Sequence, residues 1–199
     1  MPLILEGLLT TLNADGTTNV AAQGPIVVET DREFLFRPYQ GSTSRDNLLR
    51  EQHGVFQTLD DVLLLARTVV AGLTGIVTET PELIPSVKSA TPTLEAACRA
   101  WEFEIVEVRS TNERAELTAR VTHARTLRAS HGWNRAQFAV IETAILATRL
   151  RMLDRDEVRR DLTRWERVVE KTAGPREATA FAILLDAIKL QYRRIDSEP

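Results

Sequence analysis

The stretch "FLFRPYQGSTSRDNLL", residues 34–49, joins a strand-like run to a helical pattern through a polar break. The run ends in an arginine, and three hydroxyl side chains then gather where a helix is expected to begin, over about 43–51. The N-terminus of a helix presents free backbone N–H groups, and with an arginine and hydroxyl donors these groups bind a phosphate monoester. Asn47, one turn into the helix, can reach back with its amide. The predicted phosphate site comprises Arg37, Ser42, Thr43, Ser44 and Asn47.

A purely structural interpretation of the same residues is also open. Ser42 or Thr43 would then only cap the helix, since serine and threonine are common N-cap residues. Arg37 would be only a surface charge. The local pattern by itself does not separate the two interpretations.

A second segment favours the ligand site. Residues 15–28, "DGTTNVAAQGPIVV", include small side chains at Ala21 and Ala22, and Gly24 with Pro25 interrupts the strand pattern. Such residues open a flat space in which backbone amides can contact a planar ring. A flat aromatic ligand that ends in a phosphate fits both segments.

The composition of the chain argues against nucleic-acid binding, a disulfide and a metal site. The chain has 199 residues, 43% of them hydrophobic, enough for one sizeable domain or a domain with an appendage. The net charge is −3 and the basic residues are scattered, so nucleic acid is not an expected partner. The single cysteine, Cys98, excludes an intramolecular disulfide. The three histidines share no ligand spacing, so no metal site is expected.

The sequence also predicts where the protein works. No segment approaches the roughly 18–20 consecutive apolar residues of a membrane helix. The opening "MPLILEGLL" lacks the basic start and long apolar run of a signal peptide. We therefore expect a cytoplasmic protein with no membrane partner.

The first two-thirds of the chain is typical of antiparallel strands. Turn signals at 13–16 and 30–33 separate runs rich in Val, Ile, Leu, Thr and Phe. A later alternation places Trp101, Phe103 and Ile105 on one face of a long strand. The expected strands lie at about 3–12, 17–28, 33–38 and 53–59, with two long paired strands between 100 and 126. Together they could form a six-stranded barrel.

After Leu127 the period of the apolar residues changes from 2 to 3.6, which indicates helices. Three are expected, at about 134–153, 155–172 and 176–193, and a shorter one is expected earlier, at 61–72. The predicted fold class is therefore α+β, mainly β: an antiparallel split β-barrel followed by a C-terminal three-helix bundle. The predicted domains are 1–127 and 128–199.

The order of these motifs resembles the FMN-binding split β-barrel of the flavin-reductase-like superfamily. The resemblance rests on "GTTNVAA" with a following proline, on the Ser-x-Ser-x-x-Asn-Leu pattern before a helix, and on the late "TLEAACRAWEFEIVEV". It covers about 1–127, and the helical tail is similar to an uncharacterised branch of that superfamily. The resemblance implies an FMN cofactor and a homodimer with the flavin near the subunit interface.

The resemblance also implies roles for individual residues. It places Ser42, Ser44 and Asn47 on the phosphate side of the flavin. Arg37 stands where related sequences often have a basic or polar residue. The residues that it places along the isoalloxazine ring are Asn19, Val20, Ala21 and Ala22.

The sequence departs from the reductase pattern in two ways. The usual basic residue just before the phosphate serines is displaced into "RPYQG", and the late histidine of many flavin reductases has no obvious counterpart. FMN binding is therefore better supported than oxidation of NAD(P)H.

The segment "SHGWNRA" precedes the first C-terminal helix. His131, Asn134 and Arg135 could close over the flavin or bind an anionic substrate. The alternative is a solvated loop with a helix cap.

Three functions follow from these patterns. The first is an FMN-dependent oxidoreductase that acts on a small organic substrate. The second is a non-catalytic flavin-binding module whose helical tail binds another protein. The third is a protein-interaction module that no longer binds flavin. An enzyme would have its flavin reduced by a preferred donor and reoxidised by an acceptor, whereas a carrier would show no such preference.

Overall fold

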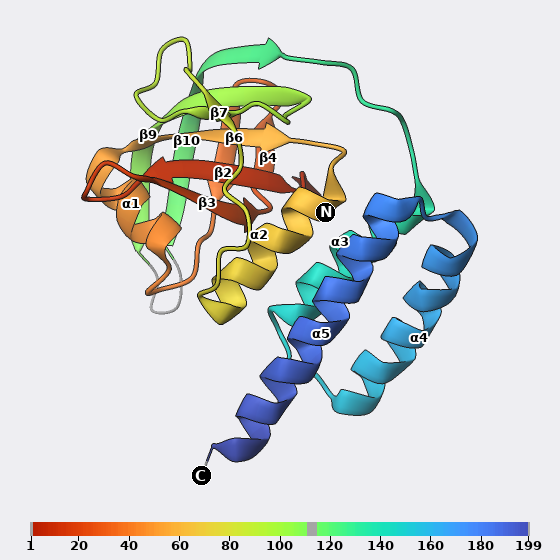
Figure 1. Ribbon diagram of the computed structural model, residues 1–199. Helices are drawn as coiled ribbons and strands as arrows, with labels where there is room; N and C mark the ends of the chain where they lie inside the picture. The colour runs from red at the N-terminus through yellow and green to blue at the C-terminus, as the bar shows by residue number, and fades with distance from the viewer. Residues whose placement is uncertain (1, 111–114, 199) are drawn as a thin grey trace. The chain divides into compact units, whose positions relative to one another are not determined.

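The computed structural model describes residues 2–110 and 115–198, which form two compact units (Figure 1). The first unit, the barrel unit, consists of Met1–Asp60 and Pro81–Ser130. The second, the helical unit, consists of Asp61–Thr80 and His131–Pro199. The expected α+β class, with an antiparallel sheet and three C-terminal helices, is confirmed.

The barrel unit is built on one eight-stranded antiparallel sheet in the order β1-β4-β5-β10-β9-β6-β2-β3. A single helix, α1, follows β5, and β7 pairs with β8 in a separate two-stranded sheet. The elements of this unit are β1 (Leu3–Ile4), β2 (Gly7–Leu12), β3 (Thr18–Gln23), β4 (Ile26–Glu29), β5 (Glu33–Phe36), α1 (Thr43–Glu51), β6 (His53–Thr58), β7 (Leu83–Ile84), β8 (Thr93–Leu94), β9 (Arg99–Ser110) and β10 (Ala115–Thr126).

The expected strand over 17–28 is two strands. β3 pairs with β2, whereas β4 pairs with β5 and β1, at the opposite end of the sheet order. The break falls at Gly24 and Pro25, because proline has no N–H to donate to a ladder. Pro25 instead accepts a backbone hydrogen bond from Leu5 (3.2 Å), where the expected strand over 3–12 is also interrupted. The split leaves β3 as an edge strand.

An aromatic cluster fills the core of the barrel unit. The predicted inward face of β9 is confirmed, because Trp101, Phe103 and Ile105 are all buried. Phe103 stacks on Phe36 of β5 with ring centroids 4.9 Å apart, and Trp101 meets Phe34 edge to face at 5.6 Å. Such aromatic pairs stabilise a core beyond the apolar area that they bury.

Glu102 lies on the other face of β9, yet it is fully buried. Its carboxylate accepts backbone hydrogen bonds from Val87 (2.7 Å), Lys88 (2.6 Å) and Ser89 (2.7 Å), so it holds the loop between β7 and β8. Burial opposes ionisation, but the three donors outweigh it and His123 adds a weaker attraction, so the pKa of Glu102 lies below its ordinary value.

We expect Glu102→Gln to lower the free energy of unfolding by about 1–3 kcal/mol at pH 7, because an amide cannot accept all three N–H groups. The stabilisation by ionised Glu102 is complete above the ordinary glutamate pKa of about 4.3 and is lost as the pH falls through the folded-state value. The variant should therefore lose less stability than the unmodified protein when the pH is lowered from 6 to 3. Urea unfolding at several pH values measures both effects.

The control for this substitution is Glu104→Gln. Glu104 is on the same strand but exposed, and it pairs with Arg120 (2.8 Å). An exposed pair contributes about 0–1 kcal/mol. Equal losses in the two variants would contradict the role given to Glu102.

The helical unit contains the three expected C-terminal helices and one helix from the first half of the chain. Side chains cap three of them: Asp61 accepts from the first turn of α2, Asn134 from that of α3 and Asp154 from that of α4. α5 begins with Pro175 after Gly174. The helices are α2 (Val62–Thr74), α3 (Arg135–Ala147), α4 (Arg155–Thr172) and α5 (Pro175–Ser197).

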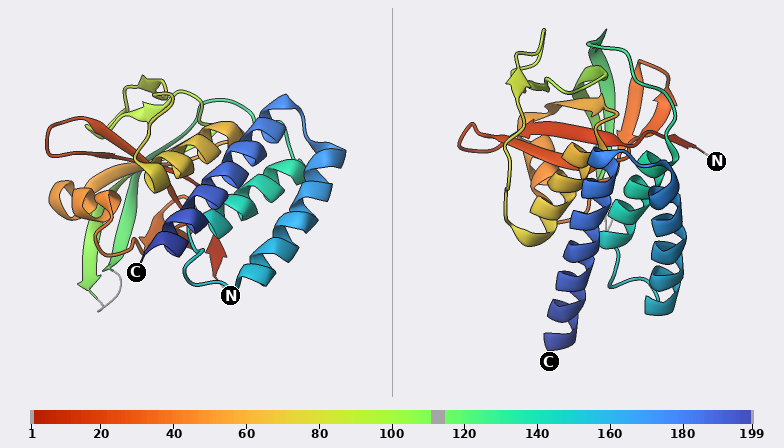
Figure 2. Two further views of the ribbon diagram at one scale, coloured as in Figure 1. Left: turned by 60° about the horizontal axis from the view of Figure 1, so that its bottom comes forward. Right: turned by 45° about the vertical axis from the view of Figure 1, so that its right-hand side comes forward.

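α5 packs against α2 and α3, and α4 packs against α3 (Figure 2). The core includes Leu150, Val158 and Ile188, with Leu73 of α2 packed against them. α2 therefore shares the core of helices that follow it by more than 50 residues. None of the helices among the described residues has the length and apolar character that are needed to span a membrane.

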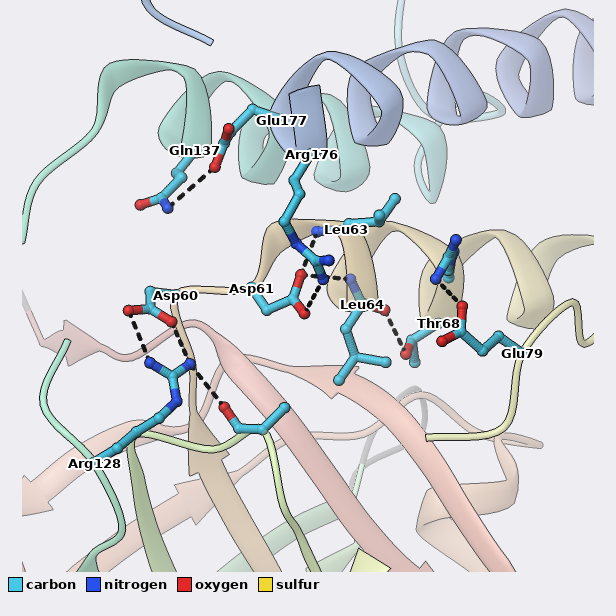
Figure 3. Close-up of polar contacts among 12 residues, drawn as sticks. Asp60, Asp61, Leu63, Leu64, Thr68, Glu79, Arg128, Gln137, Arg176 and Glu177 are labelled. Atoms are coloured by element: carbon cyan, nitrogen blue, oxygen red, sulfur yellow. Dashed lines mark hydrogen bonds and ion pairs between the residues drawn. The ribbon is translucent and has the colours of Figure 1, made fainter. Parts of the chain in front are cut away.

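The chain leaves the barrel unit and enters the helical unit between two consecutive aspartates, Asp60 and Asp61. Asp60 pairs with Arg128 inside the barrel unit, whereas Asp61 caps α2 and pairs with Arg176 of α5 inside the helical unit (Figure 3). Another passage lies between Ser130 and His131, close to the division expected at 127/128. The grouping of α2 with the C-terminal helices was not expected from the sequence, and the predicted domain limits remain a prediction.

Candidate functional site

The break after β5 and the start of α1 have the predicted form. Ser42 is the N-cap: its Oγ accepts from the Arg45 N–H (3.4 Å) and donates to the Tyr39 carbonyl (2.8 Å). Gly41 has a positive φ of 76°, and an added Cβ there would meet no atom within 4 Å. The backbone just before the helix therefore borders open space, and the N–H groups of the first turn have no partner within the helix.

One hydrogen bond joins the two predicted halves of the site. The Asn19 Nδ2 on β3 donates to the Oγ of Ser44, the second residue of α1 (3.2 Å). The sequence places these residues in separate segments, the ring side and the phosphate side. The barrel unit brings them together.

β3 presents free backbone groups to this site. It is an edge strand that pairs only with β2 among the described residues. The Asn13 N–H donates to the Thr17 carbonyl across the hairpin turn (2.8 Å), so these two residues form a hydrogen-bonded pair. Along an antiparallel ladder, such pairs alternate with pairs that share no backbone hydrogen bond. Asn19 and Ala21 therefore bond to β2. The N–H and C=O groups of Val20 and Ala22 point toward the open edge.

Asn47 has a different environment from the one predicted. It is buried, and its amide donates to Thr11 Oγ1 (3.0 Å) and to Asn13 Oδ1 (2.9 Å). Its own oxygen accepts from Arg50 (2.9 Å). Both amide hydrogens are thus engaged within the protein. Asn47 fastens α1 to the β2–β3 hairpin.

The sequence reasoning missed Thr11, Asn13 and Arg50. A usable signal was present, because the turn "NADG" fixes the register of the hairpin and pairs Thr11 with Asn19. Cross-strand partners share a face of the sheet. A buried threonine hydroxyl opposite a site asparagine was therefore predictable.

The arrangement suits an anion with several oxygen acceptors. Among the described residues, Arg37 and Thr43 make no side-chain hydrogen bond or ion pair. The Nε of Arg45 is buried without a partner, although its guanidinium pairs with Asp46 (3.2 Å). Free cations and hydroxyl donors beside a helix N-terminus are the groups that bind phosphate.

The three residues expected at a lid belong to the helical unit. Asn134 caps α3 by accepting from Ala136 (2.7 Å), and it donates to the Thr172 carbonyl (3.3 Å). His131 and Arg135 are exposed. The cap role of Asn134 agrees with the structural alternative for this segment, and closure over a ligand remains a prediction.

The thiol of Cys98 is buried. Burial, with a smaller contribution from Asp60, raises the pKa of the Cys98 thiol, which disfavours the reactive thiolate. Across residues 2–110 and 115–198, no group of three His, Cys, Asp or Glu side chains could hold a metal ion.

Solved structures share the fold. An FMN-bound protein of the DUF447 family from Methanosarcina mazei superposes with a TM-score of 0.73 at 22% identity, covering 94% of this chain and 96% of its own. The 2-nitrobenzoate 2-nitroreductase of Pseudomonas fluorescens gives 0.52 at 19% identity, covering 63% and 66%. An NADH:FAD oxidoreductase of Streptomyces globisporus gives 0.50 at 12%, covering 61% and 74%. The resemblance to the flavin-reductase-like split barrel is therefore confirmed for the fold.

Sequence comparison identifies the family. No curated protein is similar enough to the chain to count as a match. The "protein of unknown function (DUF447) N-terminal domain" matches residues 5–128, and the "protein of unknown function (DUF447)" model matches residues 134–186. The two matches span most of the chain, so this protein belongs to the DUF447 family.

Proposed function

We propose that this protein binds FMN in the barrel unit and uses it as a flavin-dependent oxidoreductase for a small organic substrate. The observation that carries the proposal is the hydrogen bond between Asn19 and Ser44. It puts a helix N-terminus with phosphate donors directly beside a strand edge with free backbone groups. FMN has a phosphate at one end and a planar ring at the other.

The phosphate would bind at the start of α1. The hydroxyls and backbone N–H groups of Thr43 and Ser44 are available donors. The Ser42 hydroxyl already donates to the Tyr39 carbonyl (2.8 Å). Arg37 supplies a guanidinium with no competing partner among the described residues. A helix of nine residues adds a favourable field for negative charge at its N-terminus. The donor set therefore fits a phosphate monoester.

The ring would lie along the open edge of β3. Val20 and Ala22 direct backbone N–H and C=O groups outward, and these can pair with the polar edge of an isoalloxazine. The small side chains of Ala21 and Ala22 leave room for a ring to approach the backbone. Backbone hydrogen bonds of this kind orient a flavin and tune its electronics.

Bound FMN would supply the electron or hydride transfer, and the chain would supply position and electrostatics. The nitroreductase and NADH:FAD oxidoreductase names of two structural neighbours support the redox proposal. His131 and Arg135 remain candidates for contact with an anionic substrate. The cytoplasmic location remains a prediction.

The alternative is a flavin-binding or protein-interaction module without redox turnover. One observation favours it: Trp133 is 93% exposed and stacks on the partly exposed Phe138 with ring centroids 5.6 Å apart. Exposed aromatic pairs are common at protein interfaces. Reduction of the bound flavin by a preferred donor, followed by reoxidation by an acceptor, would support the enzyme.

The first measurement is the visible absorption spectrum of the purified protein before and after addition of FMN. We expect a flavin band, and we expect FMN when the ligand is released and its mass determined. Absence of both a band and any binding of added FMN would overturn the proposed function and favour the interaction module.

Arg37→Ala should weaken FMN binding about tenfold and leave riboflavin binding nearly unchanged, because only FMN carries the phosphate. Fluorescence titration with each flavin measures the two dissociation constants. Arg32→Ala is the matched control, since Arg32 is also exposed but pairs with Glu29 (2.9 Å). An equal loss for both flavins in Arg37→Ala would contradict the phosphate assignment.

We also propose a homodimer with the flavin near the subunit interface. The outer face of the sheet supports the homodimer, because a groove of about 690 Å³ there is lined by Val28, Leu35 and Val106 with charged residues around them. Val28 and Val106 are 55% and 43% exposed. Apolar groups gathered on one exposed face often mark an interface.

Val106→Glu should shift the protein from dimer to monomer in sedimentation velocity, because it adds a like charge to a groove that Glu33, Glu107 and Glu116 already line. Val77→Glu is the control, at another exposed valine in the helical unit. A monomeric unmodified protein, or a dimer that tolerates Val106→Glu, would contradict this interface.

A further inference from the structure

The hydroxyl of Thr11 connects the two halves of the site. Thr11 lies on β2 and is fully buried. Its Oγ1 accepts from Asn19 Nδ2 of β3 (3.1 Å) and from Asn47 Nδ2 of α1 (3.0 Å). A hydroxyl oxygen has two lone pairs, so these two amides use its whole capacity as an acceptor.

Both amides direct their nitrogen at the Thr11 oxygen. The orientation of Asn47 is set by Arg50, which can only donate and bonds to the Asn47 oxygen (2.9 Å). Asn47 has its second hydrogen on Asn13 (2.9 Å), and Asn19 has its second hydrogen on Ser44 (3.2 Å). Networks in which each bond orients the next are worth more than separate pairs.

The orientation of Asn19 determines what Ser44 can do. Ser44 is buried and its Oγ accepts the Asn19 N–H, so its own hydroxyl hydrogen must find another acceptor. Among the described residues, Ser44 Oγ makes a hydrogen bond only as an acceptor, from Asn19. Ser44 is in the first turn of α1, where the phosphate is proposed to bind, and a phosphate oxygen is an acceptor without a hydrogen to donate.

We propose that Thr11 is a positioning residue for the flavin phosphate: it holds the Asn19 amide so that Ser44 presents its hydroxyl hydrogen to a phosphate oxygen. This inference rests on the proposed function. It predicts that the Thr11 hydroxyl increases the preference of the protein for FMN over riboflavin. A residue with a purely structural role would not change that preference.

Thr11→Val keeps the shape of the side chain and removes the hydroxyl. We expect the affinity for FMN to fall about tenfold, as for one lost hydrogen bond to a charged group, and the affinity for riboflavin to change less than about twofold. Thr11→Ser keeps the hydroxyl and should restore the preference. Fluorescence titrations with FMN and with riboflavin give the ratio for each variant.

Thr10→Val is the matched control. Thr10 is the neighbouring residue, is equally buried, and turns its hydroxyl to the other face of β2, where it donates to the Pro92 carbonyl (2.7 Å) and accepts from Gln57 (3.2 Å). This variant should lose stability in urea without changing the ratio of flavin affinities. An equal change of the ratio in Thr10→Val and Thr11→Val would overturn the proposal.

Two further variants keep the test decisive. In a Ser44→Ala background, Thr11→Val should cause no additional loss of FMN affinity, because the two residues act through one bond; additive losses would overturn the proposal. If Thr11→Val does not fold, Asn19→Ala removes the connecting amide and should reduce the preference in the same way.

The outcomes separate the inference from the proposed function. If the unmodified protein binds neither flavin, both fail. If it binds FMN tightly but Thr11→Val and Asn19→Ala keep the original ratio, only the role of Thr11 fails.

Discussion

The register of the β2–β3 hairpin is the constraint on which the rest of the site depends. Its turn is closed by the backbone bond from Asn13 to Thr17 (2.8 Å), with Gly16 at a φ of 81°. This turn places Thr11 opposite Asn19. Because side chains alternate with a period of two, a slip by one residue would move Asn19 to the other face of the sheet. The contact between the strand and α1 would then be lost.

The position of β3 in the sheet is the second constraint. A long exposed edge is a hazard, because its unpaired backbone groups can pair with another chain. β3 has only six residues, because Gly24 and Pro25 end it. The next strand, β4, lies near the opposite end of the sheet. α1 contacts β3 near its start, through the hydrogen bond between Asn19 and Ser44. A ligand along the remaining edge would satisfy groups that are otherwise left to solvent.

The elements that follow from local pattern were predictable from the sequence, and those that depend on distant packing were not. The cap at Ser42, the inward face of β9 and the three C-terminal helices come from neighbouring residues. By contrast, spacing along α1 cannot reveal that Asn47 is bonded to a strand 36 residues earlier. Alternation places Glu102 on an outer face but does not reveal the loop that covers it. The segment before α3 is a similar case, because its sequence does not reveal that Asn134 caps the helix and bonds to the distant Thr172 carbonyl.

The assignment of α2 to the helical unit has a consequence for shortened forms of the chain. The two carboxylates at 60 and 61 belong to different packing units although one peptide bond joins them. A chain that ended before His131 would keep α2, with Leu65, Ala66 and Val69 facing inward, but lose the α3 and α5 helices on which it packs. Removal of the C-terminal helices alone would therefore expose apolar side chains of α2, whereas removal of residues 61–80 as well would take away the whole helical unit.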